Sequence, residues 1–186
     1  MDVGVITIRI ARIEDAGQIC ALVNSAYRGE VSKQGWTTEA DFLDGQRTDE
    51  EALAETLSVP GNAFLLLLQD ESLLGSVHLQ KKEGYAYLGM LTIKPDQQGA
   101  GHGKQLLAEA ENWVRDEWGL TKIRMNVIQK RWELIAWYER RDYRVTSERS
   151  PFPYGNPRLG IPKVTDLEFL VLEKALPHLP DSSQSR

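Results

Sequence analysis

Residues 91–104 read LTIKPDQQGAGHGK and place three glycines, Gly99, Gly101 and Gly103, close together. Glycine lets the backbone adopt positive φ angles and lets a ligand come close to the main chain. An amphipathic helical pattern follows the glycines, and the first N–H groups of a helix have no partners within that helix. Together with the helix dipole, these features predict a binding site for phosphate groups.

The glycine pattern separates several kinds of phosphate site. A dinucleotide-binding fingerprint would require glycine at position 104 after Gly99 and Gly101, but the residue there is Lys104. A P-loop would require glycine at position 98 and Ser or Thr at position 105, and the sequence has Gln at both. The pattern that fits is Q/R-x-x-G-x-G/A, here Gln98, Gly101 and Gly103. An NAD- or ATP-dependent enzyme is therefore disfavoured.

This loop resembles the pyrophosphate-binding motif of the GNAT superfamily of acyl-CoA-dependent N-acetyltransferases. A second segment, residues 133–143, is similar to the family's A-x-x-x-Tyr-x-x-x-Gly-Phe segment, with Tyr138 at the tyrosine and Asp142 where glycine is usual. Asp tolerates the left-handed conformation better than most residues, so we expect the turn to be kept. The resemblance extends from Ile8 to about Leu172. The alternative is a glycine turn with a purely structural role.

The resemblance implies acetyl-CoA as co-substrate and no metal. The backbone at Ile93 is expected to pair with the pantetheine like an added strand. Because Gln98 replaces the commoner Arg of the motif, Lys104 is the nearby cation for the pyrophosphate, and Arg131 stands where many members have an Asn facing the pantetheine. The expected cofactor-binding residues are Leu91, Thr92, Ile93, Gln98, Gly99, Ala100, Gly101, His102, Gly103, Lys104 and Arg131.

The family's reaction is the direct attack of an amine on the thioester. The amine must be neutral to attack, although a free alkylamine has a pKa near ~10.4. The resemblance implies that the backbone N–H of about Leu91 stabilises the developing oxyanion and that Tyr138 donates a proton to the CoA thiolate. A phenol with a pKa near ~10 is protonated at neutral pH. The alternative is that Tyr138 is a core residue with a satisfied hydroxyl.

The sequence offers no clear general base. Many family members have Glu or His on the fourth strand, but residues 85–93 contain neither. His78, on the preceding strand, is a weak candidate, and His102 is expected to donate to phosphate or solvent. We expect a chain of water molecules to remove the amine proton.

The acceptor pocket implied by the resemblance lies between the first two helices and the loop that joins the last two strands. The expected lining residues are Tyr27, Trp36, Glu39, Asp41 and Tyr154, together with Phe152 and Asn156. Aromatic walls with carboxylates suit a cationic amine, in a small molecule or a peptide. The acidity of residues 30–58, whose net charge of −6 exceeds the −5 of the whole chain, favours the same class. The alternative is that Glu39 and Asp41 are simply solvated.

Seven strands and four helices are expected to position these residues. Alternating or continuous apolar patterns predict strands at 5–10, 63–69, 73–82, 85–93, 122–128 and 164–174, and a further strand begins at 143–146. Helical patterns occupy 14–27, 48–58, 104–118 and 133–141, with Thr48 and Glu51 as a capping box and Gly119 after the third helix. The resulting fold class is α/β (α+β), a GNAT-like fold with a mixed central sheet of about six to seven strands and about four flanking helices.

Length and composition restrict the remaining classes. A chain of 186 residues fits one domain over 1–176, and residues 177–186 are expected to be a flexible tail. No run of 18 apolar residues exists, which argues against a membrane span, and a pI near 5.3 argues against nucleic-acid binding. A single cysteine, Cys20, and the absence of a signal-peptide pattern favour a cytoplasmic location. A homodimer is the commonest soluble assembly. A non-catalytic acyl-CoA-binding sensor or partner module is the alternative to an enzyme.

Overall fold

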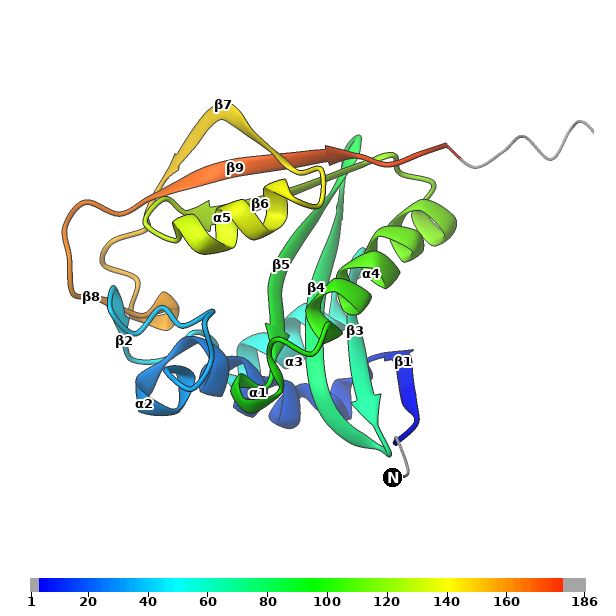
Figure 1. Cartoon of the computed structure of the whole chain (residues 1–186), viewed down its shortest axis with the longest axis horizontal. Helices are drawn as coiled ribbons and strands as arrows, with labels where there is room; N and C mark the ends of the chain where they lie inside the picture. The colour runs from blue at the N-terminus through cyan, green and yellow to red at the C-terminus, as the bar shows by residue number, and fades with distance from the viewer. Residues whose placement is uncertain (1–3, 179–186) are drawn as a thin grey trace, which may run out of the picture.

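The computed structural model describes residues 4–178, which form a mixed seven-stranded sheet with helices on both faces (Figure 1). The strand order is β1 (Ile6–Ile10), β3 (Asn62–Gln69), β4 (Ser72–Lys82), β5 (Tyr85–Ile93), β6 (Lys122–Ile128), β9 (Glu168–Ala175) and β7 (Arg144–Pro151). Neighbouring strands are antiparallel except for β5 and β6, which are parallel. The predicted mixed sheet of six to seven strands is confirmed.

Four of the five α-helices correspond to predicted segments. They are α1 (Ala16–Tyr27), α3 (Glu50–Ser58), α4 (His102–Trp118) and α5 (Trp132–Glu139), and the unpredicted α2 (Gly29–Ser32) is a single turn. Three 3-10 turns, η1 (Ile13–Asp15), η2 (Pro95–Gln97) and η3 (Pro157–Leu159), and a small antiparallel pair, β2 (Leu43–Asp44) with β8 (Ile161–Pro162), complete the described chain.

Strand β3 shows why the sheet has a core on each face. Phe64, Leu66 and Leu68 pack in one buried cluster with α1 and α3. Leu65 and Leu67 belong to the opposite cluster, which contains the apolar face of α4. A strand covered on both faces needs apolar residues at every position, which explains why residues 63–68 form a continuous run instead of alternating.

Helix and turn ends agree with sequence expectations at two positions and differ at a third. Gly119 ends α4 at φ +64°, and Asp142 adopts φ +68° after α5, so both predicted left-handed turns are confirmed. The cap of α3 is Asp49, whose side chain accepts a hydrogen bond from the Ala52 N–H at 2.8 Å, and not Thr48. Asp49 has the extended backbone that a cap requires, so the predicted capping box was wrong by one residue.

The last two strands also differ from their predicted bounds. β7 continues to Pro151 because its pairing with β9 resumes after an irregularity that follows Val145. β9 begins at Glu168 instead of 164, because β6, its other partner, is paired only from Phe169 onward.

Strands β5 and β6 separate soon after they meet. Their parallel pairing covers only Ala86 with Ile123 and Tyr87 with Arg124. On the other side, the β4–β5 register shifts between Ser76 and His78, opposite a bulge in β5. Figure 1 shows β5 turning away from β6, with α5 in the angle between them. The end of β5, beyond Tyr87, therefore has no partner in the β6 register.

The remaining expectations concern the chain ends and membranes. The expected flexible tail, 177–186, falls mostly outside the described residues. Within residues 4–178, each helix is too short or too polar to cross a lipid bilayer.

Candidate functional site

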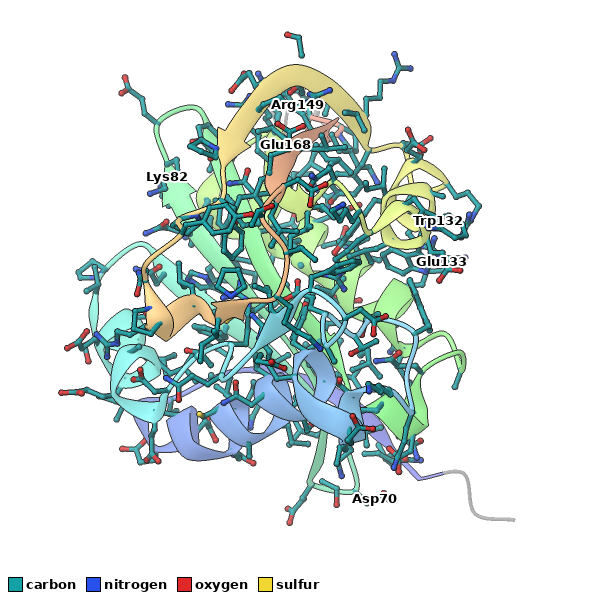
Figure 2. The ribbon with its side chains drawn as sticks, turned by 90° about the vertical axis from the view of Figure 1, so that its left-hand side faces the viewer. Asp70, Lys82, Trp132, Glu133, Arg149 and Glu168 are labelled. Atoms are coloured by element: carbon teal, nitrogen blue, oxygen red, sulfur yellow. The ribbon has the colours of Figure 1, made fainter. Side chains whose placement is uncertain are left out.

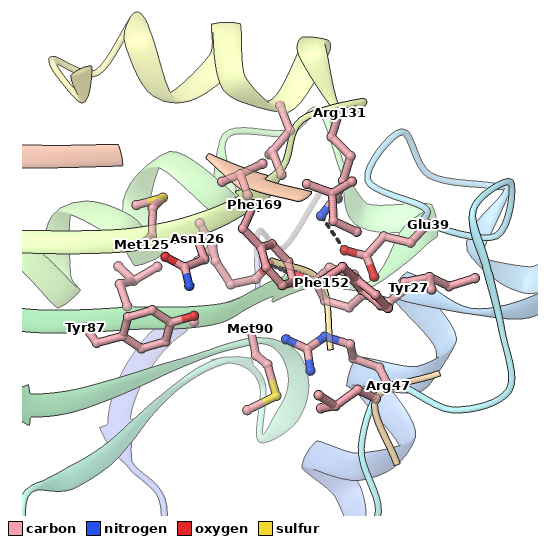
Figure 3. Close-up of a pocket in the computed structure, with 18 of the residues that line it drawn as sticks. Tyr27, Glu39, Arg47, Tyr87, Met90, Met125, Asn126, Arg131, Phe152 and Phe169 are labelled. Atoms are coloured by element: carbon pink, nitrogen blue, oxygen red, sulfur yellow. Dashed lines mark hydrogen bonds and ion pairs between the residues drawn. The ribbon is translucent and has the colours of Figure 1, made fainter. Parts of the chain in front are cut away.

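Two cavities meet beside the opening between β5 and β6. The first, the glycine-loop groove, holds about 510 Å³ and is lined by the end of β5, residues 98–104 and α5. The second, the arginine pocket, holds about 250 Å³ and is lined by Tyr27, Arg28, Glu39, Arg47 and Arg131, with β5, β6 and Phe152 (Figure 3). Leu91, Leu134 and Tyr138 line both cavities. These shared residues mark the place where a molecule in the groove can meet a molecule in the pocket.

Backbone conformation shapes the glycine loop. Gly99 and Gly101 have φ angles of +88° and +89°, and Gly101 is the residue from which α4 begins. A Cβ at either position would meet no atom within 4 Å among the described residues. Glycine is therefore needed there for its dihedral angles and not for space. The loop turns into α4 with its first N–H groups free of partners in the helix, as an anion site requires.

Three cations line the groove. They are Lys104 at the start of α4 and the consecutive Arg140 and Arg141 at the end of α5, against one acid, Glu133. The Arg141 guanidinium lies 3.6 Å from the Trp137 ring centroid and donates to the Trp137 carbonyl at 2.7 Å. Sequence reasoning missed both arginines, although the four-residue spacing from Trp137 to Arg141 on a helix was a usable signal.

The Gln98 side chain connects two segments of the chain by hydrogen bonds. Its Oε1 accepts from the Trp36 N–H at 2.9 Å, and its Nε2 donates to the Thr37 hydroxyl at 2.9 Å and to the Ile93 carbonyl at 3.1 Å. A Cβ at Gly35 would clash with this side chain. The amide side chain, predicted to face the pyrophosphate, therefore joins the segment after α2 to the end of β5.

The other predicted cofactor residues divide into two groups. Leu91, Ile93, Gly103 and Lys104 line the groove, whereas Thr92, Ala100 and His102 do not. Thr92 is buried, and its hydroxyl donates to the Met90 carbonyl at 2.9 Å. Exposed residues at the outer end of α5 form the rim: Figure 2 shows Trp132, 70% exposed, and Glu133 projecting from the helix.

The bulge in β5 presents the main chain to the junction of the two cavities. Met90 has φ +47°, which is uncommon for a residue with a side chain. Neither Met90 nor Leu91 has a partner in the registers of β4 and β6, both of which lie inside residues 4–178. The Tyr27 hydroxyl donates to the Leu91 carbonyl at 2.7 Å and so fixes the orientation of this peptide.

Tyr138 is buried but keeps its hydroxyl available. Its side chain is 5% exposed and packs edge-on against Trp137 and Tyr143, with centroid distances of 5.1 and 5.5 Å. Burial raises its pKa, so the phenol is protonated at neutral pH. No hydrogen bond joins this hydroxyl to another residue between 4 and 178, and Tyr138 lines both cavities where they meet. It can donate a proton or a hydrogen bond there.

Glu39 is held between two arginines. Its Oε1 accepts from Arg131 at 2.8 Å, its Oε2 is paired with Arg28, and all three side chains are less than a tenth exposed. Burial alone would raise the pKa of Glu39, but the charges of Arg131, Arg28 and Arg47 together hold it below its ordinary value. Glu39 is therefore ionised, with both oxygens engaged, and is not a solvated carboxylate.

The structure separates the other predicted acceptor residues. Tyr27 joins Glu39 in the arginine pocket, but Trp36 lines the glycine-loop groove instead. Asp41 and Tyr154 are exposed and line neither cavity. The Tyr154 hydroxyl accepts from the Leu167 N–H at 2.8 Å and orders the loop before β9. Arg131, expected at the pantetheine, faces the arginine pocket.

Sequence reasoning missed most of the polar lining of the arginine pocket. The missed residues are Arg28, Arg47, Tyr87 and Asn126. Three arginines against the one acid Glu39 give this lining a net charge of +2. The negative charge of residues 30–58 therefore does not make the lining of this pocket negative. The charge argument for a cationic acceptor does not apply to the pocket.

His78 is a structural residue. It stacks on Phe64 with a centroid distance of 4.6 Å, its Nε2 pairs with Asn62 Oδ1 at 2.8 Å, and it lines neither cavity. Burial lowers its pKa to about 4. Among residues 4–178, no group of three or more His, Cys, Asp and Glu side chains is arranged to bind a metal ion.

Comparison with known proteins gives a consistent result. The sequence model described as the acetyltransferase (GNAT) family matches residues 18–143. The ribosomal-protein-S18-alanine N-acetyltransferase of Escherichia coli is similar in structure, with a TM-score of 0.66, 14% identity, and coverage of 96% of this chain and 98% of that one. The PaiA N-acetyltransferase of Thermoplasma acidophilum, in complex with coenzyme A, has a TM-score of 0.64 and 22% identity over 92% of this chain and 99% of that one.

A third similar structure, from Bacillus anthracis and in complex with acetyl coenzyme A, has a TM-score of 0.55 and 19% identity, and 66% of each chain is covered. At these identities the structural matches describe the fold. No curated protein sequence is similar enough to this chain to count as a relative.

Proposed function

The chain belongs to the acetyltransferase (GNAT) family, and from this premise we propose that it transfers an acetyl group from acetyl-CoA to a primary amine. The observation that carries the proposal is the junction of the two cavities at Leu91, Leu134 and Tyr138. A group-transfer enzyme needs its donor and acceptor sites to meet at one point, with a proton donor beside it. Tyr138 has the only hydroxyl among these three residues.

The residues of the glycine-loop groove fit acetyl-CoA. Gly99 and Gly101, with positive φ angles, leave open space above the main chain for a pyrophosphate. Lys104, Arg140 and Arg141 supply cations for its charges. Acetyl-CoA supplies an activated acetyl group and leaves as the thiol of CoA. The unpaired edge of β5 at Leu91 can pair with the amide-containing arm of the cofactor, as an added strand would.

The residues at the junction have complementary roles. The role we assign to the Leu91 N–H is to donate to a carbonyl oxygen as its negative charge grows. The Tyr27 hydroxyl, bonded to the Leu91 carbonyl, supports this role by holding the peptide group. Tyr138 holds its proton on Oη, because burial raises its pKa, and donates it toward the departing sulfur.

The positive charge of the arginine pocket can produce a neutral amine without a general base. An ammonium group placed near a net charge of +2 has a lowered pKa, because the like charges disfavour its protonated form. A larger share of the amine is then neutral and able to attack. Water at the open side of the pocket can accept the proton, so no carboxylate or histidine of this chain has to act as base.

The experiment is a thiol-release assay with the full chain, acetyl-CoA and a panel of primary amines, with mass spectrometry of the amine products. We expect thiol release that depends on an amine and a matching product heavier by one acetyl group. Thiol release without an acetylated amine would show hydrolysis and contradict the proposal. Binding of acetyl-CoA with no release for any amine would favour a sensor or partner module instead.

A further inference from the structure

We infer that Arg47 binds an oxyanionic group, carboxylate or phosphate, on the molecule that occupies the arginine pocket. The inference rests on the proposed function, because that molecule is the acetyl acceptor. It adds the chemical class of the acceptor, which is an amine that also carries a negatively charged group.

Arg47 differs from the other two arginines in what its guanidinium contacts. Arg28 is paired with Glu39 and donates to the Leu159 carbonyl at 3.0 Å. Arg131 is paired with Glu39 and donates to the Thr37 carbonyl. The Arg47 guanidinium makes no hydrogen bond or ion pair with any residue from 4 to 178; its recorded contact is the Tyr27 ring, 5.9 Å away. It is the uncommitted cation of this pocket.

The main chain around Arg47 is held in place. The Asn24 side chain on α1 accepts from the N–H groups of Arg47 and Thr48, at 2.7 and 3.2 Å, and donates to the Thr48 carbonyl at 2.9 Å. Figure 3 shows the guanidinium pointing from this anchored backbone into the pocket, on the side of Met90. The backbone that carries this charge is thus held by α1, the same helix that supplies Tyr27.

Electrostatics select the kind of group that Arg47 can bind. Both oxygens of Glu39 are engaged by Arg28 and Arg131, so no acid is left in the lining to balance the third cation. A guanidinium has a planar, forked set of donors that matches the two oxygens of a carboxylate or phosphate. An acceptor with an oxyanionic end would offset one positive charge and leave a net charge of +1 beside its amine. That remaining charge still lowers the pKa of the amine.

The volume of the arginine pocket also restricts which acceptors can bind. The pocket holds about 250 Å³ and is lined by Tyr27, Tyr87, Phe152 and Phe169 around the charged groups. A small amphipathic amine with an anionic end fits this combination of aromatic walls and one free cation. A polycationic amine does not, since three arginines would repel it.

The test compares ligands that differ only in the anionic group. The first set pairs N-acetyl derivatives of the common L-amino acids with the corresponding N-acetyl amino acid amides, titrated into the full chain saturated with CoA. The acetylated α-nitrogen does not titrate, and any side-chain charge is the same in both members of a pair, so a difference in affinity reports the carboxylate alone. The second set pairs N-acetyl-O-phosphoethanolamine with N-acetylethanolamine, which separates phosphate from carboxylate.

We expect at least one anionic product to bind about tenfold to hundredfold more tightly than its neutral partner, as for a charge-assisted hydrogen-bonded pair. Arg47→Gln removes this preference, and Arg47→Lys keeps part of it. The matched control is Arg149→Gln, which removes one exposed positive charge on β7 (Figure 2) and leaves the preference unchanged. CoA affinity, measured in separate titrations of the chain without other ligands, stays within about twofold in all variants.

The outcomes separate the inference from the proposed function. Equal affinity for the charged and neutral members of every pair, or a preference that persists in Arg47→Gln, overturns the role of Arg47 whether or not the chain acetylates amines. If the charged preference depends on Arg47 and yet no amine releases thiol from acetyl-CoA, the anion site stands and the proposed transfer is wrong.

Discussion

A substitution of Tyr138 gives the most direct test of the proposed chemistry. Replacing it with Phe removes one hydroxyl and leaves a ring of nearly the same size in the same packing against Trp137 and Tyr143. Loss of a positioned proton donor typically costs about a hundredfold or more in rate. We therefore expect Tyr138→Phe to lower kcat by about 10²-fold with little change in acetyl-CoA affinity, measured by initial rates and by titration.

The matched control is Tyr143→Phe. Tyr143 is equally buried, its ring is 5.5 Å from that of Tyr138, and its hydroxyl donates to Glu111 at 2.9 Å, away from both cavities. This variant should lose about 1 kcal/mol of stability and keep its kcat. Unchanged turnover in Tyr138→Phe, or an equal loss of kcat in both variants, would refute the proton-donor role.

His78 provides a pH-dependent prediction at the same scale. Burial lowers its pKa to about 4, whereas an unfolded histidine has a pKa near ~6.5. Between these values the unfolded chain binds a proton that the folded chain does not, so the free energy of unfolding falls as the pH drops from 6.5 toward 4. The loss reaches at most about 3 kcal/mol and is complete below pH 4.

Urea unfolding of the wild type and of His78→Gln at pH 7.0, 5.5 and 4.5 measures this contribution. Gln keeps a hydrogen-bonding group for Asn62 but does not titrate, so the variant should lose markedly less stability over this interval. Carboxylates with a lowered pKa, such as Glu39, also begin to lose their contribution at about pH 5, but they do so equally in both proteins, so the difference between the two proteins reports His78. Identical pH dependence in the two proteins would exclude His78 as the source.

At the scale of elements, α4 has a glycine with a positive φ angle at each end, and the two glycines can be compared by substitution. Gly101 begins α4 at φ +89°, and Gly119 ends it at φ +64°. An alanine in a left-handed conformation costs about 1–2 kcal/mol, so both Gly101→Ala and Gly119→Ala should be destabilised by that amount. Only Gly101→Ala should also weaken acetyl-CoA binding, by about tenfold, because it shifts the N–H groups at the groove.

Calorimetry with acetyl-CoA and denaturant unfolding, applied to both variants, separates the two effects. Equal affinity of the two variants for acetyl-CoA would mean that the loop conformation does not govern cofactor binding. A loss of affinity in Gly119→Ala as large as in Gly101→Ala would point to a general loosening of α4 instead.

These elements were also the most predictable from the sequence. The β3–β5 strands and α4 have clear apolar patterns, continuous in β3 and periodic in α4, and the conformations at Gly119 and Asp142 follow from local preferences of single residues. The turn α2 and the two-residue strands β2 and β8 are too short to produce a pattern. The Arg28–Glu39–Arg131 cluster joins positions 11 and 92 residues apart, so only the tertiary fold reveals it.

At the scale of the whole molecule, charge counted along the sequence differs from charge in space. Residues 30–58 carry a net −6, but six of their eight acids are exposed and Asp49 pairs with Arg158 from the loop before β8. Glu39 alone of the eight is buried, and it is matched by two arginines from outside the segment. Both cavities are consequently lined by more cations than acids, although the chain as a whole is acidic.

This uneven distribution leads to a prediction for the intact chain. An anionic ligand that binds only the folded state raises its stability by about 2.7 kcal/mol at a concentration 100 times its Kd. For a chain of this length, that corresponds to a Tm increase of roughly 5–10 °C. We expect acetyl-CoA to produce such an increase. We expect the increase to shrink as salt rises from 0.05 to 0.5 M, because dissolved ions screen the attraction between the cofactor's phosphates and Lys104, Arg140 and Arg141. NAD and ATP, whose loop motifs the sequence lacks, should raise Tm much less at equal concentration. A larger rise in Tm with NAD or ATP than with acetyl-CoA would contradict the assignment of the groove to acetyl-CoA. A rise in Tm with acetyl-CoA that does not depend on salt would contradict the role given to the three cations of the groove.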